Sequence, residues 1–204
     1  MLDFGKRALN KAQTRLNIMN AVVHLCADVH FRDLKVKAII DDAGITEMTF
    51  FNYFPKKEDV LKYMMGMREL DQLVLQLREP LKGADGIRRI FAHTAEQAMQ
   101  NPRLIKNLVA AILTGEVDPN AIEIEAADRY LLYPDLPELY EMQIPSGNEM
   151  LIKHILEMNP GADPMPMLMR LASCFYGDMV LAFTAGLDLG TLYEHSLQEI
   201  LGNC

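Results

Sequence analysis

The chain has 204 residues, of which 50% are apolar and 24% are charged, and its net charge is −8. This balance is ordinary for a soluble globular protein with a substantial core. The three cysteines lie far apart with no CxxC pair, which argues against disulfides and against a cysteine metal site. No basic leader precedes an apolar run, and the apolar stretch at 179–187 is too short to cross a bilayer. We therefore expect a cytoplasmic protein that uses no membrane.

The charge is unevenly spread along the chain. Residues 1–66 contain ten basic and eight acidic residues, whereas residues 67–204 contain ten basic and twenty acidic residues. Such an asymmetry indicates that the N-terminal part meets a polyanion and that the remainder does not.

Apolar residues recur at intervals of three and four, and the alternating pattern of strands is missing. We therefore expect an all-α protein with about nine or ten helices. The first helix is predicted at about 9–30 and a short second helix at about 35–42, ended by Gly44. Thr46 is a good N-cap for a third helix at about 46–53, which Pro55 ends.

The later helices are separated by glycine, proline and capping residues. A long helix is predicted at about 57–79, followed by helices at about 85–100 and from Pro102 to about 115. Residues 117–147 contain four prolines and should form short helices and loops. Ser146 should cap a helix at about 147–158, and two last helices are expected at about 165–186 and 189–201.

One stretch carries a functional signature. Residues 36–61 read VKAIIDDAGITEMTFFNYFPKKEDVL, in which a helix, a tight turn with glycine and a second short helix form a helix-turn-helix. This stretch resembles, without a gap, the DNA-binding signature of the TetR family of bacterial transcriptional regulators. The matching positions are Val36, Ile39, Ala43, Gly44, Ile45, Thr46, Thr49, Phe50, Phe51, Tyr53, Phe54, Lys57, Glu58 and Leu61. The resemblance implies a helix-turn-helix DNA-binding domain at 1–56 and a helical effector-binding and dimerisation domain at 57–204.

The third helix has two faces. Phe50 and Phe54 lie four residues apart, so we expect both in the core. The opposite face carries base-reading candidates: an amide for adenine, a carboxylate for cytosine and a methionine for the thymine methyl group. Hydroxyl groups and one cation are available for phosphates. The predicted DNA-binding residues are Lys35, Thr46, Glu47, Met48, Thr49, Phe51, Asn52, Tyr53 and Lys57.

The remaining chain supports dimerisation more strongly than it identifies a ligand. One short helix reads few base pairs, so two copies on a two-fold DNA site are needed. By resemblance, the last two helices would form the interface, with Leu168, Leu171, Phe175, Met179 and Phe183 as a stripe that could equally be plain core. The 14 methionines favour an adaptable cavity for a small apolar or aromatic effector. Its candidate lining residues, each of which could also be core, are Phe91, His93, Met99, Leu113, Tyr130 and Tyr133.

These observations predict a homodimeric, ligand-responsive repressor that releases a palindromic double-stranded DNA operator when a small-molecule effector binds. A second hypothesis is a TetR-fold protein-interaction module with weak or no sequence-specific DNA binding. Phe51 motivates it, because the family usually has tyrosine there, as do the acidic residues Asp41, Asp42 and Glu47. No nucleophile elbow, P-loop, dinucleotide fingerprint or metal-ligand cluster is visible, so we expect neither an enzyme nor a cofactor.

Overall fold

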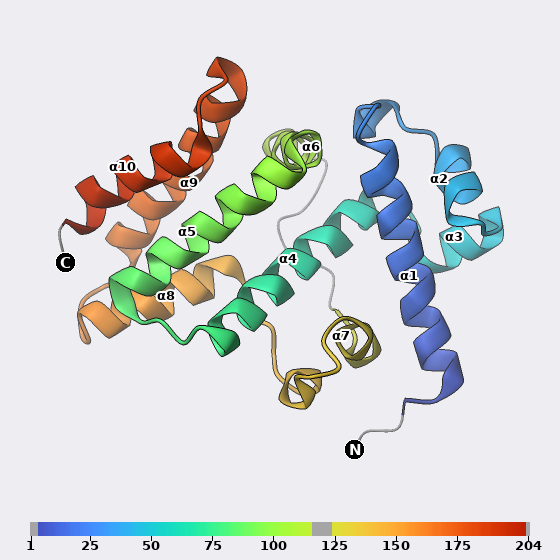
Figure 1. The fold of residues 1–204 in the computed structure, drawn as a ribbon, viewed down its shortest axis with the longest axis horizontal. Coiled ribbons are helices and arrows are strands. Elements are labelled where there is room, and N and C mark those ends of the chain that lie inside the picture. The colour runs from blue at the N-terminus through green and yellow to red at the C-terminus, as the bar shows by residue number, and fades with distance from the viewer. Residues whose placement is uncertain (1–3, 116–123, 203–204) are drawn as a thin grey trace. The chain divides into compact units, whose positions relative to one another are not determined.

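The structure is a computed structural model that describes residues 4–115 and 124–202. Within these ranges the chain is helical, and it contains ten α-helices, two short 3-10 helices and no strand, which confirms the predicted fold class (Figure 1). The elements are α1 (Lys6–Leu25), η1 (Phe31–Asp33), α2 (Val36–Ala43), α3 (Glu47–Tyr53), α4 (Glu58–Arg78), α5 (Gly83–Gln100), α6 (Pro102–Leu113), α7 (Ala126–Leu132), η2 (Pro137–Tyr140), α8 (Gly147–Met158), α9 (Met165–Ala185) and α10 (Leu189–Leu201). The first helix thus starts and ends earlier than its apolar pattern suggested. Part of the irregular segment predicted at 117–147 lies outside the described residues.

The chain forms two compact units, each built from two separate segments of the sequence. Unit 1 comprises residues 1–70 and 103–144, and unit 2 comprises residues 71–102 and 145–204. Helix α4 therefore contributes its first part to unit 1 and its last part to unit 2. The domains that we predict at 1–56 and 57–204 are a functional division, and they remain a prediction.

Unit 1 is built around α1. This helix packs against α2 on one side and against α7 on another. Its buried side chains include Leu16, Ile18 and Val22. The fully buried Tyr63 of α4 joins this core and donates a hydrogen bond of 3.0 Å from its hydroxyl to Asp128 of α7. The helix-turn-helix therefore shares one core with α7, a segment from much later in the chain.

Unit 2 is a set of closely packed helices in which α5 contacts α8 and α10, and α9 contacts α10. The rings of Phe91, Phe175 and Tyr193 meet at centroid distances of 4.8 to 5.6 Å. Helices α5 and α8 approach where Gly86 faces the fully buried imidazole of His154. Any β-carbon at Gly86 would lie 2.3 Å from that ring, so the approach requires glycine at this position.

Helix α9 has two apolar faces, and most of the predicted dimer stripe lies on the face that packs inside unit 2, so its role in dimerisation remains a prediction. Leu168, Leu171 and Met179 are buried inside unit 2, while Phe175 and Phe183 are half-buried. The other face of α9 exposes large apolar side chains at helical spacing, namely Met165, Met169, Tyr176 and Val180, and Leu181 beside them is exposed too. By length and composition alone, α9 is the one helix in the described ranges that could cross a membrane, a longer apolar segment than the stretch at 179–187.

Candidate nucleic-acid interface

The turn between α2 and α3 has the geometry of a helix-turn-helix. Gly44 ends α2 in the left-handed conformation, with φ of 65°, and Ile45 donates its backbone N–H to the carbonyl of Ile40. A residue with a β-carbon is strained at this φ, which explains the glycine. Thr46 then caps α3, because its hydroxyl accepts a hydrogen bond of 3.2 Å from the backbone N–H of Thr49. Both expectations for this turn are confirmed.

Aromatic side chains fix the inner face of α3. Phe50 and Phe54 are 0% and 1% exposed, which confirms that both belong to the core. The Phe54 ring meets the ring of Tyr63 edge-on at 5.7 Å, so α3 is tied directly to α4. A seven-residue helix is too short to be stable alone, and this packing holds it in one orientation.

The outer face of α3 is open to solvent. Glu47, Met48, Phe51 and Asn52 are all exposed, with Met48 at 73% and Phe51 at 43%. Phe51 also packs edge-on against the buried Phe50, with 5.3 Å between the ring centroids, so one side of its ring rests on the core. The three base-reading candidates and Phe51 therefore form one accessible surface.

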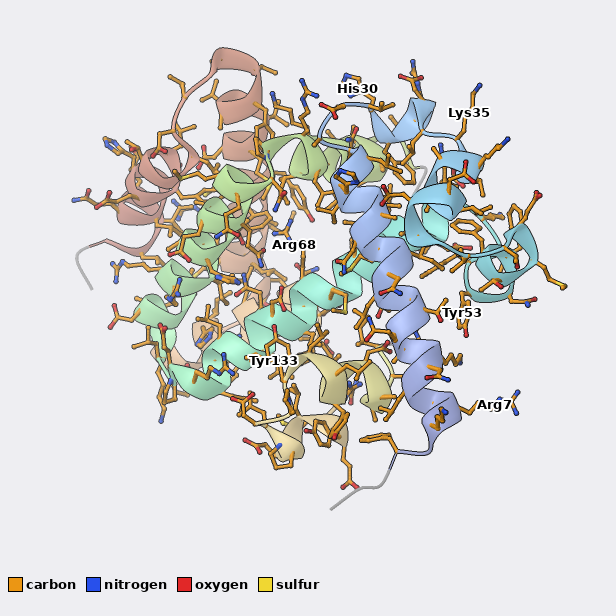
Figure 2. All side chains as sticks on the ribbon, turned by 45° about the vertical axis from the view of Figure 1, so that its right-hand side comes forward. Arg7, His30, Lys35, Tyr53, Arg68 and Tyr133 are labelled. Atoms are coloured by element: carbon orange, nitrogen blue, oxygen red, sulfur yellow. The ribbon has the colours of Figure 1, made fainter. Side chains whose placement is uncertain are left out.

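The hydroxyl-bearing candidates lie at the edges of this surface. The hydroxyls of Thr46 and Thr49 are hydrogen-bonded to each other at 2.8 Å. Thr46 is exposed and Thr49 is half-buried, and so is Tyr53 at the end of α3. Lys35, the N-cap residue of α2, is exposed and extends outward from unit 1 (Figure 2).

Lys57 has a structural role that the sequence did not indicate. Its ammonium group donates three hydrogen bonds, to the backbone carbonyls of Phe31, Arg32 and Leu34, at 2.9 to 3.0 Å. It also lies 4.7 Å from the centre of the Phe31 ring. An ammonium has three N–H donors, and all three are used here. A phosphate contact by Lys57 would require this group to leave the carbonyls that it holds.

Sequence reasoning missed a group of polar residues on α1. Four of them share one helix face, because they follow the spacing i, i+3, i+4, i+7: Arg7, Asn10, Lys11 and Thr14. With Lys6, and with Asn52 and Tyr53 of α3, they line a groove of about 640 Å³. Arg7 projects into solvent, and Tyr53 lies beside α1 (Figure 2). The charge and helical spacing of these residues were the signals that could have found them.

The expected effector residues are divided between the two units, and their role in ligand binding remains a prediction. Phe91, His93 and Met99 belong to unit 2, whereas Leu113, Tyr130 and Tyr133 belong to unit 1. Phe91 is fully buried in the aromatic core, and Met99 and Leu113 are 70% and 65% exposed. Tyr130 packs with Phe4 and Tyr140 at 5.2 and 5.7 Å between ring centroids. His93 lies 3.5 Å from Glu96 and forms no metal-binding cluster among the described side chains.

The geometry defines a class: an all-α protein whose N-terminal helix-turn-helix presents an exposed second helix on a rigid aromatic base. No protein-family model and no curated protein matches the sequence. Solved structures match the fold. A TetR transcriptional regulator from Rhodococcus sp. RHA1 aligns with a TM-score of 0.56 at 14% identity, over 94% of this chain and 97% of that chain.

A second match is FadR of Thermus thermophilus, a TetR family transcriptional repressor in complex with lauroyl-CoA. It aligns with a TM-score of 0.58 at 20% identity, over 92% of this chain and 93% of that chain. The chain therefore has the fold of the TetR family transcriptional regulators, as the resemblance at residues 36–61 implied.

Proposed function

We propose that the protein is a homodimeric, ligand-responsive transcriptional repressor that binds a palindromic operator in the cytoplasm. One observation carries the proposal: α3 presents Glu47, Met48 and Asn52 to solvent while Phe50 and Phe54 fix the helix from beneath. A recognition helix must expose base-reading side chains in a defined orientation, since each contact requires a set geometry in the major groove.

Dimerisation is supported by helix α9. Its exposed face carries Met165, Met169, Tyr176 and Val180, interspersed with the small residues Ser173 and Gly177. Small residues allow two helices to approach closely, and large exposed apolar patches mark interaction surfaces. A second copy of the same helix, related by a two-fold axis, would cover this face and bring two recognition helices to one operator. We therefore propose this exposed face as the dimer interface, in place of the predicted stripe, in which Leu168, Leu171 and Met179 are buried.

The effector is proposed to be small and apolar or aromatic, with at least one hydrogen-bonding group. Gln72 is buried and donates its amide N–H to the Ile90 carbonyl and to Thr94, at 3.3 and 3.4 Å. Its oxygen has no hydrogen-bond partner in the described part of the chain. An unpaired buried acceptor costs about 1–3 kcal/mol, and a hydrogen bond from a ligand that reached it would offset this cost. The FadR match is in complex with lauroyl-CoA, whose acyl chain is apolar although its coenzyme A part is charged, so this compound is the first effector to test.

The effector would act through its difference in affinity between two arrangements of the dimer. Two recognition helices must lie about 34–36 Å apart to enter successive major grooves. A ligand that binds better to a dimer with another spacing shifts the population away from the DNA-binding state.

The experiment is a gel-shift titration with DNA from the gene's own genomic neighbourhood and with random duplexes of equal length. We expect sequence-selective binding that weakens with salt, because phosphate contacts release counterions. Absence of selective binding at low salt would refute the proposal. Release by lauroyl-CoA tests the effector separately.

A protein-interaction module is the second candidate, favoured by the exposed Met48 and Phe51 beside the acidic Glu47. Methionine and aromatic side chains are common at protein–protein contacts, and a carboxylate repels phosphate. Co-purification of a stable protein partner, with no detectable DNA binding, would favour this candidate over a repressor.

A further inference from the structure

The groove between α1 and α3 is a second cationic surface that the helix-turn-helix resemblance does not include. Its lining comprises Lys6, Arg7, Asn10, Lys11 and Thr14 from α1, and Asn52 and Tyr53 from α3. These described residues bring three cations and no carboxylate to the lining. The lining is therefore positively charged, which is the property that an anion-binding surface requires.

The cations differ in how free they are to bind a ligand. Lys6 and Arg7 are both exposed to solvent. Lys11 already has a partner, because its ammonium group lies 2.6 Å from the carboxylate of Glu125. Glu125 also accepts a hydrogen bond from Arg15. Thr14 uses its hydroxyl proton on the Asn10 carbonyl at 2.8 Å. Lys6 and Arg7 are thus the groove's main charged donors, supported by the Asn10 amide and the Tyr53 hydroxyl.

The position of the groove identifies its ligand. One wall is the end of α3, the helix whose outer face carries the base-reading candidates. When a recognition helix lies in the major groove, a sugar-phosphate strand runs alongside it. We propose that this groove binds that DNA strand, with Lys6 and Arg7 of α1 contacting phosphates next to the half-site. The inference rests on the proposed DNA-binding function.

The proposal explains how DNA affinity is maintained despite changes in the helix-turn-helix itself. Phe51 lacks the phosphate-contacting hydroxyl, Glu47 is acidic, and Lys57 uses its three donors on backbone carbonyls. Sequence-independent affinity depends on cations that neutralise phosphates. Lys6 and Arg7 supply these cations from a different helix. Because such contacts position without reading bases, they should set affinity and register but not sequence preference.

The test compares the double variant Lys6→Gln/Arg7→Gln with the wild type and with Lys82→Gln/Lys153→Gln. The control pair lies on exposed positions of unit 2 and changes the net charge by the same amount. Binding to a random 30-bp DNA duplex is measured by fluorescence anisotropy between about 50 and 200 mM salt. Circular dichroism melting checks that all three proteins are folded. A 30-bp RNA duplex is titrated in parallel.

We expect the groove variant to bind DNA at least about tenfold more weakly at low salt. Its plot of log affinity against log salt should be shallower by about 0.9 for each lost phosphate contact. The control should match the wild type, and the RNA duplex should bind more weakly than DNA.

Four results would contradict either the groove assignment or the proposed DNA-binding function on which it rests. An unchanged slope and affinity in the groove variant would refute the groove assignment while leaving the proposed function intact. Equal losses in both double variants would show a net-charge effect rather than a site. Equal or tighter binding of the RNA duplex would replace DNA as the ligand. Failure of the wild type to bind any DNA duplex would instead refute the proposed function.

Discussion

The Arg15 guanidinium of α1 donates two hydrogen bonds to the Asp128 carboxylate of α7, from Nε to Oδ1 at 3.2 Å and from Nη2 to Oδ2 at 2.7 Å. Both side chains are buried, at 8% and 0% exposure. Asp128 also accepts from the Tyr63 hydroxyl and from the backbone N–H of Glu125, so each oxygen of this carboxylate is satisfied. Helix α1, which packs against α2 of the helix-turn-helix, is thus joined to a segment more than a hundred residues later.

Replacing Asp128 with alanine should lower the free energy of unfolding by about 3–5 kcal/mol, because the buried Arg15 cation would lose its partner. Glu125→Gln is the matched control: Glu125 is 45% exposed, so its pair with Arg15 is screened and should contribute at most about 1 kcal/mol. Urea unfolding monitored by circular dichroism gives both values. A loss for Asp128→Ala as small as that for Glu125→Gln would contradict the argument.

Gly86→Ala should destabilise unit 2 by roughly 1–3 kcal/mol, since the new methyl group would overlap the His154 ring and force α5 and α8 apart. Gly147→Ala is the control, because no atom lies within 4 Å of the β-carbon position there. Thermal melts of both variants make the comparison. Equal melting temperatures for Gly86→Ala and the wild type would show that the helices can separate without cost.

Val180→Asp should raise the dissociation constant of the proposed dimer at least about tenfold, because the exposed face of α9 would then bury an unpaired carboxylate. Met99→Asp, which replaces an exposed apolar residue elsewhere in unit 2, controls for the loss of apolar surface. Sedimentation equilibrium measures the association. A wild-type protein that is monomeric at micromolar concentration, or a Val180→Asp dimer of unchanged strength, would overturn this assignment of α9.

Phe51→Tyr should strengthen the proposed DNA binding by about two- to tenfold, since it adds a hydroxyl group at an exposed position of α3, where the proposal places the DNA backbone. Phe50→Tyr provides the contrast, because Phe50 is fully buried and its new hydroxyl would lower stability by roughly 1–3 kcal/mol. Anisotropy titrations and melts separate the two effects. Unchanged affinity of Phe51→Tyr would place residue 51 away from the DNA backbone.

Asp188 should make stability depend on acid pH. Its carboxylate caps α10 by accepting from the backbone N–H and the hydroxyl of Thr191, both at 2.8 Å, and these bonds lower the pKa of Asp188. Because the folded pKa lies below the unfolded value of about 3.9, the stabilisation is present above that value and is lost as pH falls through the folded pKa.

Asp188→Asn keeps an N-cap that does not titrate. On acidification from about pH 6 to pH 3, the wild type should therefore lose more stability than this variant does. Urea titrations at several pH values provide the measurement. Parallel losses in the two proteins would rule out Asp188 as a source of the dependence.

The sequence by itself determined the local structure, because the deciding interactions lie within a few residues of each other. Gly44 had to end α2, Thr46 had to cap α3, and Ser146 forms a capping box with Glu149 at the start of α8. The spacing of Phe50 and Phe54 likewise identified the inner face of α3. These are short-range effects of backbone conformation, capping and helical periodicity.

Only the tertiary structure decided which apolar face of α9 is covered and what Lys57 contacts. Both faces of α9 carry apolar residues at helical spacing, so periodicity could not show that Leu171 and Met179 face unit 2 while Met169 and Val180 face solvent. The carbonyls held by Lys57 come from residues 31–34, more than twenty positions earlier. Contacts between distant segments depend on how helices pack, and a single sequence does not encode that packing in any local pattern.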